Sequence, residues 1–400
     1  MKILHINTFN QTGGAETIAY SLLKSNGENR MLVKESFQSD VQIQTLSKNL
    51  IDSFFLFLNK IIWKLGIKKV FKKAFFIEEE FNCTYQKLKK TTAYQQADII
   101  HLHNIHGGYF DLNALIQIAK EKKIVWTLHD MWPITGGEAH VFENENYKKG
   151  IGATPYKHIP PISSPLIDRR QHFLELKKKI YYSIHKNLCF VPVSNWLENC
   201  LLSSYVYDNK IKEKMIYNGY DDSVFYTIER NKNELVKILI FSSQNPFKGE
   251  SIFEEVLSKI TIPFELIVVG KNIFIDGVKT TTLPYISDRK KLADLFRSVD
   301  VLIFPSNAES FGLVPLEAMA CGACVFASSV GGIPEIITQE ETGFLFNSKE
   351  TLIKQLNTTL HNINFIHSIG SFAAKTVKNK FTLTNMVQNY NNLYHDLLSK

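Results

Sequence analysis

Short runs of apolar residues alternate along the chain with stretches of helical periodicity, a pattern typical of a parallel α/β sheet. In the first half, strands are predicted at Lys2–Thr8, Asp98–Asn104, Ile124–Asp130 and Cys189–Ser194, and helices at Glu16–Ser25 and Asp111–Glu121. The second half repeats the scheme, with strands at Lys237–Ser242, Phe264–Gly270, Asp300–Pro305 and Ala323–Ser328 and helices at Asp288–Val299 and Val314–Ala320. We therefore predict two Rossmann-like halves.

The order of these elements also predicts the domains. A chain of 400 residues is too long for a single core. We expect Rossmann-like domains over 1–194 and 195–380, facing each other across a cleft, because open α/β sheets bind ligands at their strand ends. Residues 381–400 are predicted to form a closing helix that packs back on the first domain. Residues 138–170 hold four prolines and little periodicity, so we predict a long loop over the cleft.

Composition indicates an ordinary globular protein, with 44% hydrophobic and 21% charged residues. Met1 and Lys2 run directly into a predicted strand, and no uncharged apolar run reaches the roughly 18 residues of a spanning helix. We expect a cytoplasmic protein with reduced cysteines that does not cross the membrane. Cys321 and Cys324 have the spacing of half a zinc site, but no second ligand pair accompanies them, so two small semi-buried residues are expected there.

The formal charge of +7 requires an anionic partner of some kind. Within residues 54–76 the lysines at 60, 64, 68 and 72 are spaced by four, and those at 69 and 73 widen the same helical face. Such a helix can lie in the headgroup region of an anionic membrane. The alternative is an amphipathic helix on the first sheet whose lysines are merely solvated. No nucleic-acid-binding motif accompanies the charge, so nucleic acid is not an expected partner.

The most informative motif runs from Phe304 to Gly322. A buried strand is predicted to end at Pro305, and Pro315 stands in the first turn of the following helix. The backbone N–H groups of Gly312, Leu313 and Val314 then lie at the positive end of that helix, where they can bind phosphate. Glu309 and Glu317 bracket this anion site, and carboxylates in these positions suit the hydroxyl groups of a sugar or ribose.

With these features the sequence resembles the retaining glycosyltransferases of family 4, which have the GT-B fold. The resemblance extends over nearly the whole chain and includes Gly13-Gly14-Ala15-Glu16, His101-Leu-His103, Thr127-Leu-His129-Asp130, Ile216–Asp221, Gly331–Glu335 and Thr342-Gly343-Phe344. The segment 129–137 is similar to a subset that builds bacterial surface polysaccharides.

The resemblance implies roles for individual residues. Glu309 would contact the transferred sugar, Lys248 would neutralise the diphosphate, and His129 would hydrogen-bond the donor sugar. The remaining expected contacts on the donor side are Gly13, Gly14, Ser243, Tyr285, Ile286, Gly312, Leu313, Val314 and Glu317, with Glu317 on the ribose and Tyr285 and Ile286 at the base. The expected acceptor-side residues are His103, Asp130 and Trp132.

Two departures from the family pattern qualify this expectation. Relatives commonly carry an arginine five residues before the lysine, where this chain has Ser243. Members of the similar subset often carry cysteines after the Thr-Gly-Gly element, which are absent here, so a metal-bound loop is not expected. His101 and His103 point to one face of their strand, where a metal pair is conceivable, but no third ligand is evident. We expect structural or substrate-side packing there, and no metal or cofactor.

The leading hypothesis is a metal-independent, retaining hexosyltransferase. It would use a nucleotide diphosphate sugar and a lipid-linked glycan at the inner face of the plasma membrane, in bacterial surface polysaccharide synthesis. The reaction would be front-face, with the protein mainly positioning charge. One alternative is a catalytically weak partner subunit with the same fold, which the serine at 243 favours. Another is a basic nucleic-acid-binding protein.

Overall fold

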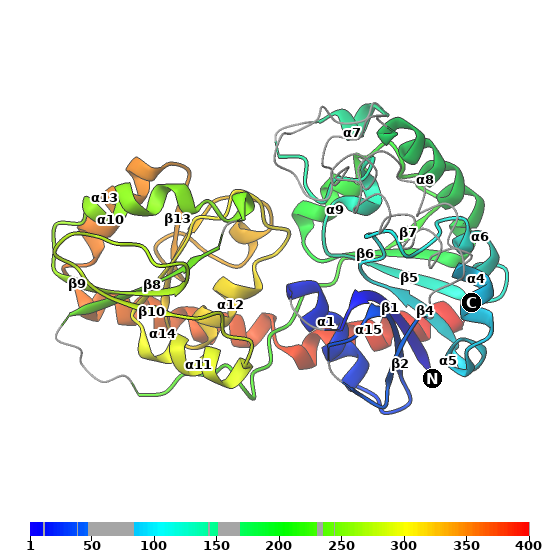
Figure 1. Cartoon of the computed structure of the whole chain (residues 1–400), viewed down its shortest axis with the longest axis horizontal. Helices are drawn as coiled ribbons and strands as arrows, with labels where there is room; N and C mark the ends of the chain where they lie inside the picture. The colour runs from blue at the N-terminus through cyan, green and yellow to red at the C-terminus, as the bar shows by residue number, and fades with distance from the viewer. Residues whose placement is uncertain are drawn as a thin grey trace, which may run out of the picture. The chain divides into compact units, whose positions relative to one another are not determined.

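The computed structural model describes residues 1–10, 13–37, 39–46, 84–142, 145–150, 169–229, 235–243 and 245–399. It divides into two compact units (Figure 1). The first unit consists of Met1–Ile216 with Asn389–Lys400, and the second of Tyr217–Gln388. The helix segment predicted over residues 54–76 lies outside the described residues.

The first unit is built on a parallel seven-stranded sheet with the order β3-β2-β1-β4-β5-β6-β7. Its strands are β1 (Ile3–Phe9), β2 (Arg30–Glu35), β3 (Ile43–Thr45), β4 (Ile99–Leu102), β5 (Lys123–Leu128), β6 (Leu188–Pro192) and β7 (Lys212–Glu213). Its helices are α1 (Gly14–Lys24), α4 (Thr84–Lys89), α5 (Thr92–Gln96), α6 (Ala114–Ile118), α7 (Asn146–Lys149), α8 (Arg170–Ile184) and α9 (Asn195–Leu202), with the 3₁₀ turns η1 (Trp132–Ile134) and η2 (His185–Asn187).

The second unit is built on a parallel six-stranded sheet with the order β10-β9-β8-β11-β12-β13. Its strands are β8 (Val236–Ser242), β9 (Phe264–Gly270), β10 (Lys279–Leu283), β11 (Val301–Phe304), β12 (Cys324–Ser328) and β13 (Phe344–Phe346). Its helices are α10 (Phe253–Ser258), α11 (Arg289–Ser298), α12 (Leu313–Ala320), α13 (Lys349–Thr359), α14 (Ile363–Lys380) and the start of α15 (Leu383–Leu398), with the 3₁₀ turns η3 (Pro246–Lys248), η4 (Glu250–Ile252) and η5 (Ile333–Glu335).

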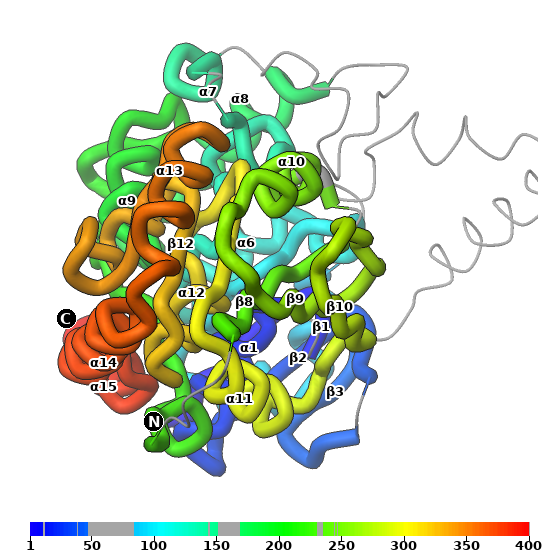
Figure 2. Tube along the Cα trace, turned by 90° about the vertical axis from the view of Figure 1, so that its left-hand side faces the viewer, coloured from blue at the N-terminus to red at the C-terminus, as the bar shows by residue number. Residues whose placement is uncertain are grey.

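The second sheet is covered on both faces, as its strands' continuous burial requires. On one face, residues of β8, β9, β11, β12 and β13 form a core with α10, α13 and α14. On the other face, Phe241 of β8 packs edge-on against Phe296 of α11. α12 contacts β12 and lies beside α14 (Figure 2).

The first sheet also presents two different faces. Trp126 of β5 packs with Tyr181 of α8 and Phe190 of β6. The neighbouring residue Thr127 points the opposite way and hydrogen-bonds to Tyr390 of α15 at 2.7 Å. From Asn389 on, α15 thus belongs to the first unit, where it lies against the sheet (Figure 1).

All eight predicted strands and those predicted helices that fall on described residues are confirmed as elements, with ends that differ by a few residues. Five strands were not predicted, namely β2, β3, β7, β10 and β13. Four of these are short edge strands. β3, β7 and β10 are partly exposed and lack an apolar run, whereas β13 is apolar and largely buried but too short for a periodicity to show. α8 and α14 were not predicted either, although both carry apolar residues at helical spacing.

The units divide later in the chain than the boundary expected at residue 194. α9 follows β6 directly, and β7 pairs with β6 as the last strand of the first sheet. The chain therefore leaves the first unit only after Ile216. Of the predicted loop 138–170, residues 146–149 form the single-turn helix α7, and much of the remainder lies outside the described residues.

In the part of the chain that the structure describes, no helix combines the length and the apolar character needed to span a membrane.

Candidate functional site

The turn between β11 and α12 is the centre of the predicted donor site. Gly312 caps α12 with φ of 107°, a conformation that favours glycine. A Cβ on Gly312 would also lie 2.5 Å from Ile333. The first N–H groups of α12 have no acceptor within the helix, so Leu313 and Val314 present them at its positive end. These N–H groups are the donors that the predicted phosphate-binding role requires, and that role stays a prediction.

Lys248 and Glu309 come together beside this turn, from two different loops. Lys248 ends η3, and its Nζ lies 3.3 Å from Oε2 of Glu309. Gly249 makes the approach possible, because it has φ of 65° and a Cβ there would lie 1.7 Å from the Pro305 carbonyl oxygen. The Asn307 N–H donates to the carbonyl of Phe247 at 2.7 Å and ties the two loops.

The backbone of Glu309 is fixed by the loop that follows β12. Gly332 donates its N–H to the Glu309 carbonyl at 3.1 Å. At Gly331, with φ of 56°, a Cβ would lie 1.7 Å from the same carbonyl oxygen. The Glu309 carboxylate is about one-fifth exposed and remains accessible to a ligand.

Glu317, one turn into α12, is 1% exposed and forms a bidentate ion pair with Arg289 of α11. The guanidinium carbon of Arg289 also lies 4.6 Å from the ring centroid of Phe225. Burial raises the pKa of Glu317, and the charge and hydrogen bonds of Arg289 oppose that rise. Glu317, the residue predicted to bind the ribose, thus has a buried carboxylate that an arginine holds in place.

Ser243, in the position where relatives commonly carry an arginine, faces an acidic residue. Its backbone N–H donates to the carboxylate of Glu250, and Ser242 Oγ donates to the same carboxylate at 3.3 Å. Tyr285 and Ile286 lie in the loop between β10 and α11, and Tyr285 is 72% exposed. An exposed aromatic ring beside that loop is free to stack on a flat ligand.

In the first unit, Gly13 is the N-cap of α1 and Gly14 its first residue. Both are exposed, and a Cβ on Gly13 would lie 2.3 Å from Oε2 of Glu16. Burial raises the pKa of Glu16, while its own backbone hydrogen bond and the nearby His106 lower it. The glycines therefore leave room for a carboxylate that folds back over the start of the helix.

His103 and His129 follow β4 and β5 directly and meet at the same end of the sheet. His103 Nδ1 lies 3.0 Å from His129 Nε2, and the rings stack. Burial lowers the pKa of His129 to about 4, so its imidazole is neutral at pH 7. A neutral imidazole can hydrogen-bond a sugar hydroxyl but adds no positive charge.

Asp130 accepts hydrogen bonds from the Trp132 N–H at 2.8 Å and faces His106 Nε2 at 3.2 Å. Burial raises the pKa of Asp130, but these two hydrogen bonds together with the charges of His106 and His129 outweigh it and leave the pKa below its usual value. The Trp132 ring is 2% exposed and lies 3.7 Å from the amine of the buried Lys177. The structure brings His103, His129 and Asp130 together, whereas Trp132 supports the loop from inside.

Among the described residues, one group of three potential ligands could hold a metal ion, namely His5, His101 and His103. His5, the third histidine, was not among the candidate ligands that the sequence predicted. His5 stands on β1 in register with His101 on β4, so the parallel pairing places both on one face of the sheet. Cys321 and Cys324 are both buried, at the end of α12 and the start of β12.

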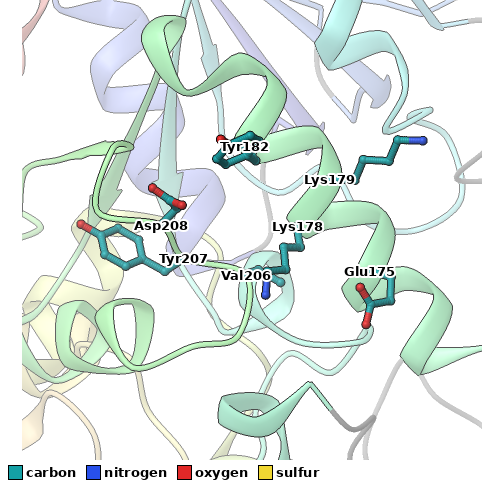
Figure 3. A pocket seen from close by; sticks show the side chains of 7 residues that line it. All are labelled: Glu175, Lys178, Lys179, Tyr182, Val206, Tyr207 and Asp208. Atoms are coloured by element: carbon teal, nitrogen blue, oxygen red, sulfur yellow. The ribbon is translucent and has the colours of Figure 1, made fainter.

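A surface pocket of about 300 Å³ lies elsewhere on the first unit, between α8 and residues 206–208 (Figure 3). Its lining includes Glu175, Lys178, Tyr182 and Tyr207 and none of the predicted site residues. It therefore offers no support for the predicted chemistry.

Part of the second unit matches a known protein family. Residues 276–376, within the second unit, match the family model described as Glycosyl transferases group 1. The chain carries a glycosyltransferase group 1 domain. The matched stretch of this glycosyltransferase domain contains Arg289, Glu309 and Glu317 and begins after Lys248.

Longer similarities extend beyond that domain. The chain is 26% identical over 323 residues to an uncharacterized 41.2 kDa protein in the cps region of Klebsiella pneumoniae, covering 76% of this chain and 80% of that protein. It is 21% identical over 351 residues to the putative colanic acid biosynthesis glycosyl transferase WcaC of Escherichia coli, covering 83% and 84%. The crystal structure of Anabaena HepE in complex with UDP-glucose matches with a TM-score of 0.66 at 16% identity, over 99% of this chain and 100% of that one. The chain thus has the GT-B fold, as predicted from the sequence.

Three residues contact predicted site residues but were not themselves predicted from the sequence, namely Arg289, Glu250 and His5. Arg289 is the first residue of α11, next to its N-cap Asp288, where a basic residue is unfavourable for the helix dipole. That unfavourable position is a sequence signal for a role outside the helix. Glu250 and His5 carry no comparable signal.

Proposed function

We propose that this protein transfers a hexose from a nucleotide diphosphate sugar to a lipid-linked glycan with retention of anomeric configuration. The observation that carries the proposal is the Lys248–Glu309 pair, 3.3 Å apart, beside the N-terminus of α12. A cation and a helix N-terminus bind the diphosphate, and a partly exposed carboxylate between them suits a sugar hydroxyl.

In the proposed reaction the bond between the sugar C1 and the diphosphate oxygen breaks, and its electron pair leaves with the diphosphate. The acceptor hydroxyl oxygen forms the new bond to C1 on the same face, and its proton passes to the departing phosphate oxygen. Lys248 and the first N–H groups of α12 stabilise the negative charge of the leaving group. Glu317, held by Arg289, binds the ribose hydroxyls. No step requires a metal ion.

The substrate class rests on the relatives. The similar proteins from Klebsiella pneumoniae and Escherichia coli are named for a cps region and for colanic acid biosynthesis. HepE, which shares the fold, was solved with UDP-glucose. These names support a nucleotide-sugar donor and a role in bacterial surface polysaccharide synthesis.

A donor panel tests this proposal most directly. Thermal unfolding is recorded with UDP-, GDP- and ADP-sugars, and the donor that stabilises the protein is then incubated with lipid-linked acceptors. We expect stabilisation by one nucleotide class and release of the matching nucleoside diphosphate. The anomeric coupling of the product, measured by NMR, decides between retention and inversion. An inverted product, or no stabilisation by any donor, would contradict the proposal.

A second candidate is a catalytically weak partner subunit of the same fold. The observation in its favour is that Ser243 replaces a common arginine and its backbone is occupied by Glu250. Such a subunit would bind a donor in the thermal assay and release no nucleoside diphosphate in a single turnover, even with acceptor present. Release at a measurable rate excludes it.

We further propose that the protein acts in the cytoplasm, bound peripherally to the inner face of the plasma membrane through residues 54–76. The proposal rests on the sequence, because these residues lie outside the described part. Replacing Lys60, Lys64, Lys68 and Lys72 with Gln removes four charges and preserves helix propensity. Co-sedimentation with anionic vesicles should fall sharply, and salt should release the wild type in the same way. Equal sedimentation of both proteins would contradict the membrane role.

A further inference from the structure

Three imidazole rings form a continuous hydrogen-bonded chain under the strand ends of the first unit. His5 Nδ1 lies 3.1 Å from His103 Nε2, and His103 Nδ1 lies 3.0 Å from His129 Nε2. His5 and His103 are 1% exposed, whereas His129 is half-buried. The chain of hydrogen bonds therefore runs from the interior of the sheet to His129, the residue predicted to bind the donor sugar.

All three imidazoles are neutral, because burial lowers the pKa of His5 to about 3 and of His129 to about 4, and that of His103 well below its usual value. A neutral imidazole has one N–H donor and one bare nitrogen. Each hydrogen bond of the chain needs one donor, so all protons must point the same way. Only two arrangements are possible, and they give His129 opposite tautomers.

The inner end of the chain decides between them. His5 Nε2 is buried and has no hydrogen-bond partner among the described residues. If the protons pointed inward, this nitrogen would carry an N–H without an acceptor. If they point outward, it carries only a lone pair. Buried N–H groups without a partner are rarer than under-satisfied acceptors, so the outward arrangement is favoured.

We propose that His5 and His103 are positioning residues that fix His129 as the tautomer protonated on Nδ1. His103 donates from Nδ1 to His129 Nε2, and His5 donates from Nδ1 to His103 Nε2. His129 is left with an N–H donor on the ring edge away from His103. This inference rests on the proposed function, in which His129 contacts the donor sugar. The ligand atom it recognises is then an acceptor oxygen of a hydroxyl, carbonyl or carboxylate group.

A metal ion bound by His5, His101 and His103 is a different explanation of the same cluster. Both ring nitrogens of His101 already have hydroxyl partners, Tyr394 at 2.7 Å and Thr127 at 2.8 Å. His103 likewise has both nitrogens engaged by its two neighbours. A metal would have to displace these hydrogen bonds, so the geometry favours the chain of imidazoles.

The tautomer can be read directly by NMR of the full chain labelled with ¹⁵N-histidine, since ring nitrogens with and without a proton have well-separated shifts. The His129 signals are identified by their loss in His129→Asn. We expect a protonated Nδ1 and a bare Nε2. A protonated Nε2 in the wild type, or one bound metal ion per chain in elemental analysis, would overturn the proposal.

Two variants of one residue provide the matched test. His103→Asn places an amide N–H where Nδ1 stands and should keep the tautomer of His129. His103→Asp places an acceptor there and should reverse it, with kcat/KM at least ten-fold below that of the Asn variant. His101→Gln, on the same strand face, is the packing control and should leave the tautomer unchanged. An unchanged tautomer of His129 in His103→Asp would overturn the proposal. This measurement does not depend on catalysis, so a wild type without transferase activity would count against the proposed function alone.

Discussion

The two units order their first six strands in the same way, yet the strand ends of the first carry neutral histidines, whereas those of the second carry a lysine–glutamate ion pair. After β4 and β5 of the first unit stand His103 and His129, whose imidazoles are uncharged at pH 7. After β8 and β11 of the second unit stand Lys248 and Glu309, which form an ion pair. The same sheet topology therefore supports two kinds of binding chemistry.

Burial explains the difference. His101 packs against Tyr390 and Tyr394 of α15, and desolvation lowers the pKa of His101 and His103 well below the usual value. Lys248 is 40% exposed, so its ammonium keeps part of its hydration. Neutral groups that are held rigidly suit the recognition of sugar hydroxyls, and partly exposed charges suit a diphosphate. Four predictions test this contrast, taken in order of expected effect.

Removing the charge of Glu309 should have the largest effect. We expect Glu309→Gln to lower kcat by about 100-fold or more, the range found when one preorganised electrostatic group is removed. Donor binding, measured by calorimetry, should stay nearly unchanged because Lys248 and α12 remain. Glu335→Gln, in the nearby turn η5, serves as the control. Full activity of purified Glu309→Gln would remove Glu309 from the mechanism.

The neutral histidines of the first unit should make the protein sensitive to acid. The pKa of His5 is about 3 in the folded chain and 6.5 in the unfolded chain, so between these values only the unfolded chain binds this proton. The free energy of unfolding must therefore fall as pH falls below 6.5, by about 2 kcal/mol for this one group at pH 5.

Urea unfolding at pH 7 and pH 5 checks this expectation. Between the two pH values, the free energy of unfolding of His5→Leu should fall by about 2 kcal/mol less than that of the wild type. The same substitution at the exposed His361, between α13 and α14, should leave the difference unchanged. Equal losses in the wild type and His5→Leu would show that His5 is not held neutral by the fold.

The exposed lysine of the second unit should contribute to turnover more than to binding. Lys248→Ala is expected to lower kcat at least ten-fold, about 1.4 kcal/mol, because the charge of the leaving group is greatest in the transition state. The exposed Lys290 gives a control substitution in the same unit. Unchanged kcat with a raised KM would mean that Lys248 binds the donor without stabilising the leaving group.

Arg289 should show a smaller effect on stability. Arg289→Met leaves the Glu317 carboxylate buried without its partner, which we expect to lower the free energy of unfolding by about 1–2 kcal/mol; the figure is discounted because the guanidinium is 37% exposed. In the double variant with Glu317→Gln the loss should be smaller than the sum of the single losses. Strict additivity in denaturant unfolding would contradict the coupling of the two residues.

Local sequence patterns predicted most of the central strands, the glycine turn before α12 and the candidate residues Glu309, Glu317 and Lys248. These features are local: apolar periodicity, a proline in a first helical turn and short motifs can be read within about 20 residues. The edge strands β3, β7 and β10 escaped prediction because partial exposure removes the apolar run, and β13 escaped because its apolar run is too short.

Which of these residues are in contact, and in which protonation state, follows from the packing of remote segments. Arg289 meets Glu317 because α11 packs on α12, and His5 meets His103 because β1 and β4 pair in a fixed register, 98 residues apart in the chain. The neutral state of His101 also depends on its burial against α15, whose Tyr394 bonds to it from 293 residues further along the chain. Contacts and desolvation of this kind follow from packing, because no local pattern in the sequence encodes the distance between two remote side chains or the water removed from around them.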